Sequence, residues 1–271
     1  MELIAEYNAL DLHNVIDHDR YNQYTIVHHS SGIEGSTLTE TETRLLLEEG
    51  TTPKGKPLEH SLMVKDHYQA LLFVMDAAQQ KRIPDTDLIQ SINAKVMHHT
   101  GGLYQTVFGE IDASNGAYRK RNVSAGGSYF VSFDKVPDYT RRLVERLREQ
   151  LSGANTLPAQ LRLSFIAHFD LVSIHPFYDG NGRTSRLLMN CLQAYFGLPL
   201  SIVYSQDKND YFEALVAARK LENTQPFEDF MANQYQQFLS AEIKQYKKDI
   251  SRTLLPKNGK GTGKGLSLFF G

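Results

Sequence analysis

The sequence predicts an all-α fold with one small β-hairpin. Apolar residues recur at three- and four-residue spacing along most of the 271 residues, as they do in helices that bury one face. The main interruption spans residues 109–133, where Gly116, Gly126 and Gly127 separate short β-prone pieces. We interpret that stretch as a hairpin or flap on an otherwise helical domain.

The helices follow in order from local signals. Thr39, with Glu42 three residues later, forms a capping box ahead of the apolar run Leu45–Leu47, which indicates a helix start. Further helices are expected over residues 61–80, 85–98, 136–151, 158–174, 183–196 and 210–218. We divide the chain into an N-terminal helical region (1–84), a core that carries the flap (85–205), a helical extension (206–250) and a glycine-rich, mobile tail (251–271).

Composition excludes several classes of protein. The formal net charge of −2 gives no general attraction to nucleic acid or to an anionic membrane, so we expect neither as a partner. The single cysteine, Cys191, excludes a disulfide framework within one chain. The first residues lack the basic and apolar segments of a signal peptide. These observations favour a cytoplasmic protein.

The most informative stretch runs from His175 to Arg186 and reads His-Pro-Phe-Tyr-Asp-Gly-Asn-Gly-Arg-Thr-Ser-Arg. It lies between two apolar runs of helix length, which places it in a loop that leads into a helix. His175 could remove a proton from a hydroxyl group, because the ordinary pKa of histidine lies near 6.5. Asp179 could hold a divalent cation. A base and a metal ligand this close in sequence indicate an enzyme site.

The second half of the stretch is suited to bind a polyanion. Gly180, Asn181 and Gly182 can turn successive N–H groups toward one point, since glycine accepts the positive φ angles of such a nest. The positive end of the following helix would face the same point. Arg183 and Arg186 are neighbours on one helix face and would aim their guanidinium groups at it. The residues therefore predict a nucleotide polyphosphate beside a hydroxyl acceptor.

This stretch matches, at every fixed position, the signature His-Pro-Phe-x-Asp/Glu-Gly-Asn-Gly-Arg-x-x-Arg of Fic-domain proteins, so the chain resembles that family. The resemblance implies a Fic-type helical fold with a small β-hairpin flap near the active site. It also implies a protein adenylyltransferase that uses ATP and Mg²⁺. Such an enzyme moves AMP to a Ser, Thr or Tyr hydroxyl of a protein and releases pyrophosphate.

The resemblance assigns a role to each residue of the motif. His175 is the general base on the target hydroxyl. Asp179 binds the Mg²⁺ that neutralises phosphate oxygens. Residues 180–182 stabilise the charge that develops on the α-phosphate. Arg183 and Arg186 hold the β- and γ-phosphates, which leave as pyrophosphate.

A second motif, Ser30-Ser-Gly-Ile-Glu34-Gly35, resembles the inhibitory motif Ser/Thr-x-x-x-Glu-Gly/Asn of Fic proteins whose inhibitory helix precedes the catalytic core. From the residues alone the segment is a loop in front of a capped helix, and that interpretation leaves Glu34 without a role. The resemblance implies that Glu34 pairs with Arg186 and displaces the triphosphate of ATP. In resembling proteins the same glutamate supports the removal of AMP, and the sequence does not decide between these directions.

Residues 116–126 resemble the segment that leads into the Fic flap. The resemblance places Val123 and Gly126 near the nucleotide. It implies that the target protein docks on residues 122–131 by strand addition. A surface hairpin without a partner is the alternative.

Downstream of the motif, Tyr211 and Phe212 fit an aromatic pair that encloses adenine in the family. Aromatic residues at helical spacing also form cores, and that alternative stays open. Arg219 stands where relatives commonly have Asn. His168 is expected to be a core residue.

Other functions stay open at this point. The same residues could transfer another nucleotide or phosphate-containing group, or remove AMP. A non-catalytic, nucleotide-sensing interaction protein is the alternative from another class, but such a protein would be free to lose His175 or Asp179. Self-modification and a homo-oligomer are compatible with the sequence. The target protein, the modified hydroxyl and the signal that relieves inhibition cannot be read from it.

Overall fold

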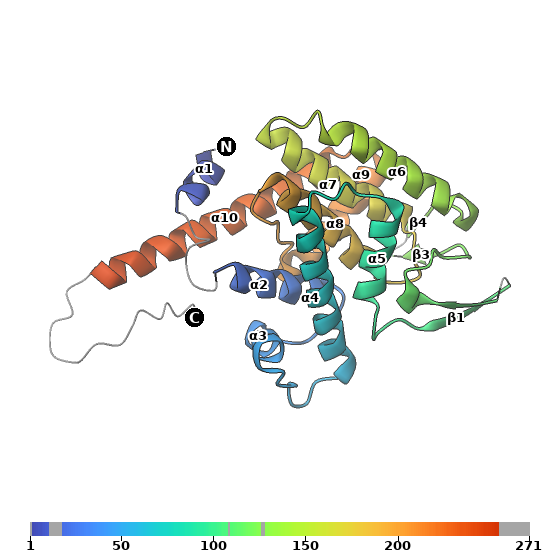
Figure 1. The fold of residues 1–271 in the computed structure, drawn as a ribbon, viewed down its shortest axis with the longest axis horizontal. Helices are drawn as coiled ribbons and strands as arrows, with labels where there is room; N and C mark the ends of the chain where they lie inside the picture. Colours follow the sequence, from blue (N-terminus) through green and yellow to red (C-terminus); the bar gives the residue numbers. More distant parts are fainter. Residues whose placement is uncertain (1, 11–17, 108, 126–127, 255–271) are drawn as a thin grey trace.

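The structure, a computed structural model, describes residues 2–10, 18–107, 109–125 and 128–254 of the chain (Figure 1). Gly126 and Gly127 of the expected flap, and the tail beyond residue 254, lie outside the described residues. No helix of the described part is long and apolar enough to cross a membrane.

Within those residues the chain folds into α-helices and two short β-hairpins. In chain order the helices are α1 (Glu2–Ala9), α2 (His18–Ile33), α3 (Glu40–Glu49), α4 (Leu58–Gln79), α5 (Thr86–Val96), α6 (Val136–Leu151), α7 (Leu157–Ile174), α8 (Asn181–Phe196), α9 (Lys208–Lys220) and α10 (Gln225–Leu254). The strands are β1 (Leu103–Thr106), β2 (Gly109–Asp112), β3 (Ser124–Ala125) and β4 (Ser128–Tyr129). The all-α prediction is confirmed, and every helix expected from periodicity is present with ends shifted by a few residues at most.

Helix α8 lies at the centre of the helical packing. It contacts α7, α4 and α5, and every residue from Arg183 to Gln193 is buried. A helix that is buried on all sides has neighbours on all of its faces, which fixes its position. The motif loop leads directly into α8, so the start of this helix and its two arginines are held in the interior of the protein.

Side-chain caps explain where several helices begin. Thr39 and Glu42 form the expected capping box: Thr39 N–H donates to Glu42 Oε2 at 2.8 Å, and Glu42 N–H donates to Thr39 Oγ1 at 3.2 Å. The Asp85 carboxylate accepts from Leu88 N–H at 2.6 Å at the start of α5. These local contacts account for the accuracy of the sequence-based helix starts.

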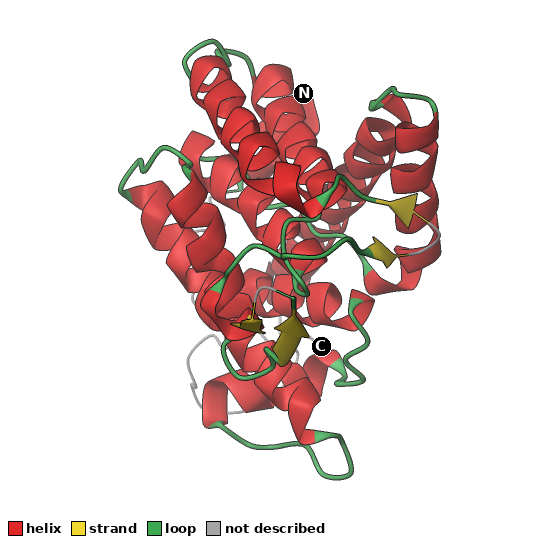
Figure 2. Ribbon diagram, turned by 90° about the vertical axis from the view of Figure 1, so that its right-hand side faces the viewer, coloured by secondary structure: helices red, strands yellow, loops and turns green. Residues whose placement is uncertain are grey.

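The β-structure differs from the prediction in one respect. The expected flap is present as the β3–β4 hairpin, but the chain forms a second antiparallel hairpin from β1 and β2, in which Leu103 pairs with Asp112 (Figure 2). Most of its side chains are exposed or half-buried. A hairpin without a fully buried face shows little apolar alternation, which explains why the sequence did not reveal β1.

Helix α2 was also missed, because its residues are mostly polar. It buries His18, Ser30 and Ser31 together with its few apolar side chains. Ser30 therefore lies in the last turn of a helix, and not in a loop as the residues alone suggested, and Glu34 follows directly after that helix. At the other end of the chain α10 packs along α1 and α9 (Figure 1).

Candidate active site

The motif loop begins where α7 ends, at His175. This residue adopts the left-handed backbone conformation with φ of 53°, and its N–H donates to the Leu171 carbonyl at 3.0 Å, which closes the last turn of α7. Pro176, next in the chain, has no N–H with which to continue the helix. The left-handed turn at His175 therefore directs the chain out of α7 and toward α8.

The loop ends at Gly180, the N-cap of α8. Its φ of 74° is easily adopted by glycine. A Cβ atom at this position would lie 2.7 Å from Met97 Sδ and 2.9 Å from Asn93 Nδ2. Gly180 is required both for its backbone conformation and for its close approach to the end of α5.

The Asn181 side chain holds the loop closed. Its Oδ1 accepts from Phe177 N–H at 2.9 Å, and its Nδ2 donates to the Phe177 carbonyl at 3.0 Å. The Phe177 ring is buried and contacts Tyr118, with 5.7 Å between ring centroids. The Asn181 amide thus bonds to both the N–H and the carbonyl of Phe177, which fixes the shape of the loop.

Asn93, a buried residue of α5, positions Asp179. Its Nδ2 donates to the Asp179 carbonyl at 3.0 Å and to Thr184 Oγ1 at 3.1 Å. No motif in the sequence includes Asn93. An asparagine inside a helix carries no local signal for a partner 86 residues away.

Arg119 is the other positioning residue that the sequence analysis missed. Its side chain is buried, and its Nε donates to the His175 carbonyl at 2.8 Å. Its Nη1 donates to the Arg121 carbonyl at 2.9 Å, and its Nη2 donates to the Val131 carbonyl. One guanidinium group thus ties the motif loop to both sides of the flap.

Arg186 is buried and meets the N-terminal region. Its Nε donates to Ser30 Oγ at 2.8 Å, and its Nη2 donates to the Ser30 carbonyl at 3.1 Å and to Glu34 Oε1 at 2.6 Å. The pairing of Glu34 with Arg186 that the resemblance implied is therefore present. The last turn of α2 is joined to the first turns of α8 through this one guanidinium group.

The Glu34 carboxylate also lies against the backbone at the start of α8. A Cβ atom built on Gly182 would lie 2.5 Å from Glu34 Oε1. The N–H groups in the first turn of a helix have no partner within the helix and attract anions. Burial alone would raise the pKa of Glu34, but the charges of Arg186 and Arg183 lower it overall. An ionised side chain of the protein itself thus lies where the sequence predicts a phosphate.

Arg183 is buried but only weakly engaged. Its Nη1 donates to the Val96 carbonyl at 3.4 Å, and its Nη2 lies 3.3 Å from Met97 Sδ and 4.0 Å from Asp179 Oδ1. Its Nε has no hydrogen-bond partner among the described residues. A buried guanidinium with a donor to spare fits a phosphate ligand.

Tyr211 belongs to the interior and not to an open base-binding surface. Its hydroxyl lies 3.0 Å from His168 Nε2 and accepts from Arg186 Nη1 at 3.5 Å. His168 stacks on Phe227 with 5.0 Å between centroids, so the expectation that His168 is a core residue is confirmed. Of the predicted aromatic pair, Phe212 is the exposed member, at 43%. Tyr211 braces Arg186, whereas Phe212 is open to contact.

The His175 ring lies against the flap. Phe130 stacks on it with 4.0 Å between centroids and an interplanar angle of 13°, and Arg219 Cζ lies 5.7 Å from the same Phe130 ring. Burial lowers the pKa of His175 to about 4, and the charges of Arg119 and Arg219 act in the same direction. The ring is therefore neutral at pH 7 and able to accept a proton. The ordinary pKa that the sequence analysis used does not apply at this position.

Asp179 is the candidate metal ligand, and its side chain is 56% exposed. Its Oδ1 accepts from Gly180 N–H at 2.5 Å. The described residues contain no group of three or more His, Cys, Asp or Glu side chains that could hold a metal ion. A cation at Asp179 would take its other ligands from phosphate oxygens and water, which is the usual arrangement for Mg²⁺ beside a nucleotide. An exposed single carboxylate fits that role.

The β3–β4 flap stands beside the loop. Asn122 Oδ1 accepts from Phe133 N–H at 3.0 Å and closes the base of the flap. Tyr129 in β4 is 91% exposed, and Val123 is half-buried in front of β3. The flap therefore presents exposed side chains next to the His175 ring.

The additional β1–β2 hairpin reaches the same loop. Tyr104 of β1 stacks on Tyr178 of the motif with 4.5 Å between centroids and an angle of 11°. Arg121 Cζ lies 5.7 Å from the Tyr104 ring and 5.6 Å from the Tyr178 ring. The Tyr178 hydroxyl accepts from Lys120 N–H at 3.0 Å. Both hairpins are thus in contact with the motif loop or its flanks.

This geometry defines a class of site. A buried helix start and two guanidinium groups form a polyanion-binding centre, with an exposed carboxylate at its edge. A neutral histidine stands beside it under a flap. The site can bind a polyphosphate and remove a proton from a neighbouring group.

Comparison with known proteins agrees with that class. Residues 83–193 match the model of the Fic/DOC family. Over 209 residues the chain is 32% identical to proteins named protein adenylyltransferase Fic from Drosophila yakuba and Drosophila melanogaster. The crystal structure of a Fic domain containing signaling protein from Bacteroides thetaiotaomicron is similar, with a TM-score of 0.78 and 25% identity over 91% of this chain and 97% of that one. Fic-1 from C. elegans shares the fold, with a TM-score of 0.68 and 23% identity over 93% of this chain and 72% of that one.

Residues 83–193 of this chain therefore form a Fic/DOC family domain. The match with the two Drosophila proteins covers 76% of this chain but 39% of each relative, so the chain spans about two fifths of the length of those proteins.

Proposed function

We propose that this chain is a protein adenylyltransferase that transfers AMP from ATP to a Ser, Thr or Tyr hydroxyl of a protein, and that Glu34 holds it in a repressed state. Family membership, the name of the Drosophila relatives and the geometry of the site support the activity. In the reaction the hydroxyl oxygen forms a bond to the α-phosphorus. The bond from that phosphorus to the oxygen that bridges to the β-phosphate breaks, and pyrophosphate leaves.

His175 is the proposed base. The ring is neutral at pH 7 and can take the proton of the target hydroxyl as the new bond forms, although its lowered pKa makes it a weaker base than an exposed histidine. Arg119 holds the His175 carbonyl and thereby the position of the ring. The other residues of the motif either cannot accept a proton at neutral pH or already have a proposed role in phosphate or metal binding.

The phosphates are proposed to lie at the start of α8. The N–H groups of residues 181–183, Arg183 and Arg186 supply donors to them. When bound at Asp179, Mg²⁺ neutralises phosphate oxygens and stabilises the leaving pyrophosphate. Phe212, which is exposed beside the buried Tyr211, is the proposed contact to adenine, and Val123 and Gly126 are proposed to line the nucleotide from the flap.

The single observation that carries the repressed state is the position of the Glu34 carboxylate. It lies 2.6 Å from Arg186 Nη2 and touches the backbone at Gly182, so it takes up both parts of the phosphate site at once. ATP bound beside it would have a displaced triphosphate. Misplacement of a reacting atom by about 1 Å can cost roughly a hundredfold in rate.

The target is proposed to be a protein that docks along residues 122–131. The exposed β4 strand and the adjacent His175 ring support this position, because a strand added at the flap would run past the base. Residues of this chain are proposed to serve as targets as well, which makes self-modification the first assay.

The experiment compares wild type with Glu34→Gly in the presence of Mg²⁺ and ATP, labelled either at the α- or at the γ-phosphate. We expect α-label on protein, at least about tenfold more with Glu34→Gly, which corresponds to about 1.4 kcal/mol. Glu49→Gly, at the exposed end of α3, is the matched control and should behave as wild type. Label transferred from the γ-phosphate instead would contradict AMP transfer. Equal labelling by all three proteins would contradict repression by Glu34.

A further inference from the structure

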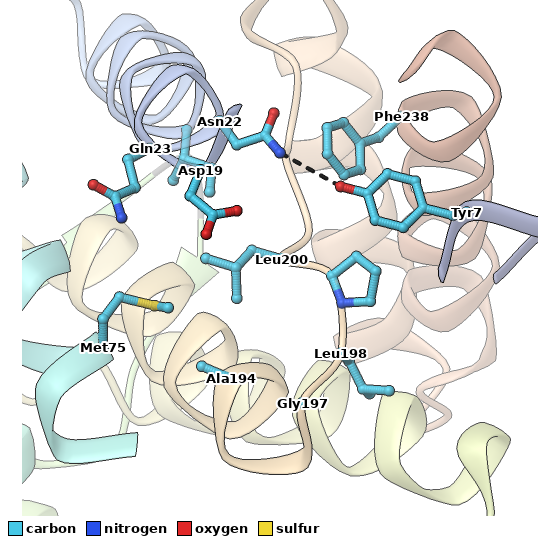
Figure 3. A pocket seen from close by; sticks show the side chains of 12 residues that line it. Tyr7, Asp19, Asn22, Gln23, Met75, Ala194, Gly197, Leu198, Leu200 and Phe238 are labelled. Atoms are coloured by element: carbon cyan, nitrogen blue, oxygen red, sulfur yellow. Dashed lines mark hydrogen bonds between the residues drawn. The ribbon is translucent and has the colours of Figure 1, made fainter. Parts of the chain in front are cut away.

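A cavity of about 220 Å³ lies along the first half of α2 and is separate from the active site (Figure 3). None of the motif residues lines it. Its walls come from α1, α2, α4, the end of α8 with the segment that follows, and α10. Along a helix that rises about 1.5 Å per residue, Asn22 in this wall lies roughly 18 Å from Glu34. The cavity and the active site thus share α2.

The cavity combines an apolar body with a few polar groups. Met75, Ala194, Leu200 and Phe238 supply apolar surface, and Figure 3 shows Asp19, Asn22 and Gln23 of α2 together on its upper side. These three residues and Ile26 are spaced so that they share one face of the helix. An apolar cavity with convergent polar groups is the usual form of a small-molecule site.

Three features of the wall favour a positive charge. Asp19 contributes a carboxylate, which also lies 3.8 Å from His18 Nδ1. The C-terminal end of α8, at Ala194 and Gly197, contributes the negative end of a helix dipole, part of which Lys81 Nζ already offsets by donating to the Tyr195 carbonyl. The rings of Tyr7 and Phe238, with 6.3 Å between centroids, can face an ammonium group.

Helix α2 is held at both of its ends. His18 Nε2 lies 2.8 Å from Glu242 Oε2 of α10, and Asn22 Nδ2 donates to the Tyr7 hydroxyl at 3.5 Å. At its other end Ser30 and the following Glu34 contact Arg186. A ligand that bridges α2 to α8 and α10 would therefore stabilise the docked position of the whole helix. The cavity exists in the state in which Glu34 is docked. A ligand that fits the cavity therefore binds this state better than a state in which α2 is displaced.

We propose that this cavity binds a small organic cation, an ammonium group on a short apolar body, and that the bound cation strengthens the contact between Glu34 and Arg186. The regulatory half of this inference rests on the proposed function, whereas the binding half does not. A cavity of about 150 Å³ accommodates benzene, so the present cavity suits a ligand of roughly nine non-hydrogen atoms. Phenethylamine has this size and charge.

The binding test is calorimetric titration of the full chain with phenethylamine and with its neutral counterpart, phenethyl alcohol. We expect the amine to bind at least about tenfold more tightly. Asp19→Asn should abolish that preference and leave the affinity for the alcohol unchanged. Ala194→Met should fill the cavity and prevent binding of both probes, and Ala232→Met, in a separate hollow between α1, α7 and α10, is the matched control. Equal affinities for amine and alcohol, binding unaffected by Ala194→Met, or no binding of the amine at about 10 mM would overturn the proposal.

The regulatory test uses reciprocity, because two coupled sites must influence each other equally. Glu34→Gly removes the far anchor of α2, so we expect it to lower the affinity for phenethylamine severalfold in the same titration, which needs no enzyme activity. Unchanged affinity would overturn the link to Glu34. In the labelling assay the amine should slow the wild type and leave Glu34→Gly unaffected. If no variant labels protein, the proposed function fails while the titrations still decide the cation site and its link to Glu34.

Discussion

Glu34 Oε1 lies 2.6 Å from Arg186 Nη2, although 152 residues separate the two in the sequence. The Arg186 guanidinium also donates twice to Ser30, so the same group holds the end of α2 and the carboxylate that follows it. Arg186 is 4% exposed and Glu34 is 26% exposed, so the cation of this pair could exchange its internal anion only for another anion, such as a phosphate. Under the proposed function, this contact would act as a switch between an internal and an external anion.

The first prediction is a double-mutant cycle on this pair. Glu34→Gly should raise the rate of self-adenylylation at least about tenfold, because it frees Arg186 for the γ-phosphate. Arg186→Ala should not raise it, since the phosphate clamp disappears together with the inhibitory partner. Glu34→Gly added to Arg186→Ala should then produce almost no further gain in initial rate. Equal stimulation by Glu34→Gly with and without Arg186 would show that the two residues act independently.

A second prediction concerns the protonation of His175. Since its pKa is lowered to about 4, the ring binds a proton only in acid solution, and the neutral form persists from neutral pH down to about pH 5. Histidine-ring NMR spectra of the free protein, with His175→Ala to assign the signal, should show this titration near 4. A midpoint near the ordinary value of about 6.5 would contradict the burial of the ring under Phe130.

His67 gives a third prediction, on stability. It is fully buried on α4, and neither ring nitrogen has a hydrogen-bond partner among the described residues. Burial, followed by the charges of Arg186 and Arg183, holds its pKa well below the ordinary value. The unfolded chain therefore takes up a proton below about pH 6.5 that the folded protein does not, and stability falls as the pH falls from there.

His67→Leu should remove this effect. Burying a polar group without a partner costs about 1–3 kcal/mol, so the variant should be as stable as wild type or more stable at pH 7. Its free energy of unfolding should also decline less between about pH 7 and about pH 5. Urea denaturation at the two pH values measures both quantities. A variant that is less stable at pH 7 and equally acid-sensitive would show that His67 has a partner in solution.

The fourth prediction tests Arg119 as a positioning residue. Arg119→Met, made together with Glu34→Gly, leaves the His175, Arg121 and Val131 carbonyls without their donor. Transfer should fall about a hundredfold through misplacement of the base, while the affinity for ATP changes little. Lys120→Met, at the neighbouring exposed position, is the control and should keep the rate. A loss of ATP affinity equal to the loss of rate would place Arg119 in the nucleotide site instead.

Local patterns account for what the sequence predicted well. The periodicity that marked α4 to α9 and the capping box at Thr39 are properties of neighbouring residues, and the structure has them where they were expected. The motif from His175 to Arg186 is likewise contiguous. Its chemistry could therefore be proposed before the fold was known.

Residues that act across long distances in the chain were not predictable in this way. Asn93, Arg119 and Phe130 each serve the motif loop through partners on other elements, and nothing next to them in the sequence signals this. The ordinary pKa expected for His175 was wrong for the same reason, because the ring is buried by the flap and not by its neighbours in the motif. Helix α2 escaped detection because it buries polar side chains whose partners lie on α8 and α10.

The stack of Phe130 on His175 has a consequence for how targets are distinguished. Phe130 lies face to face with the ring of His175, the proposed base, so a target peptide that docks on the flap as proposed would also shift or steady that ring. Target recognition and proton transfer would then both depend on the contact between Phe130 and His175. Discrimination between good and poor targets should then appear chiefly in kcat and not in KM, because the favourable interactions are completed only when the base is correctly aligned.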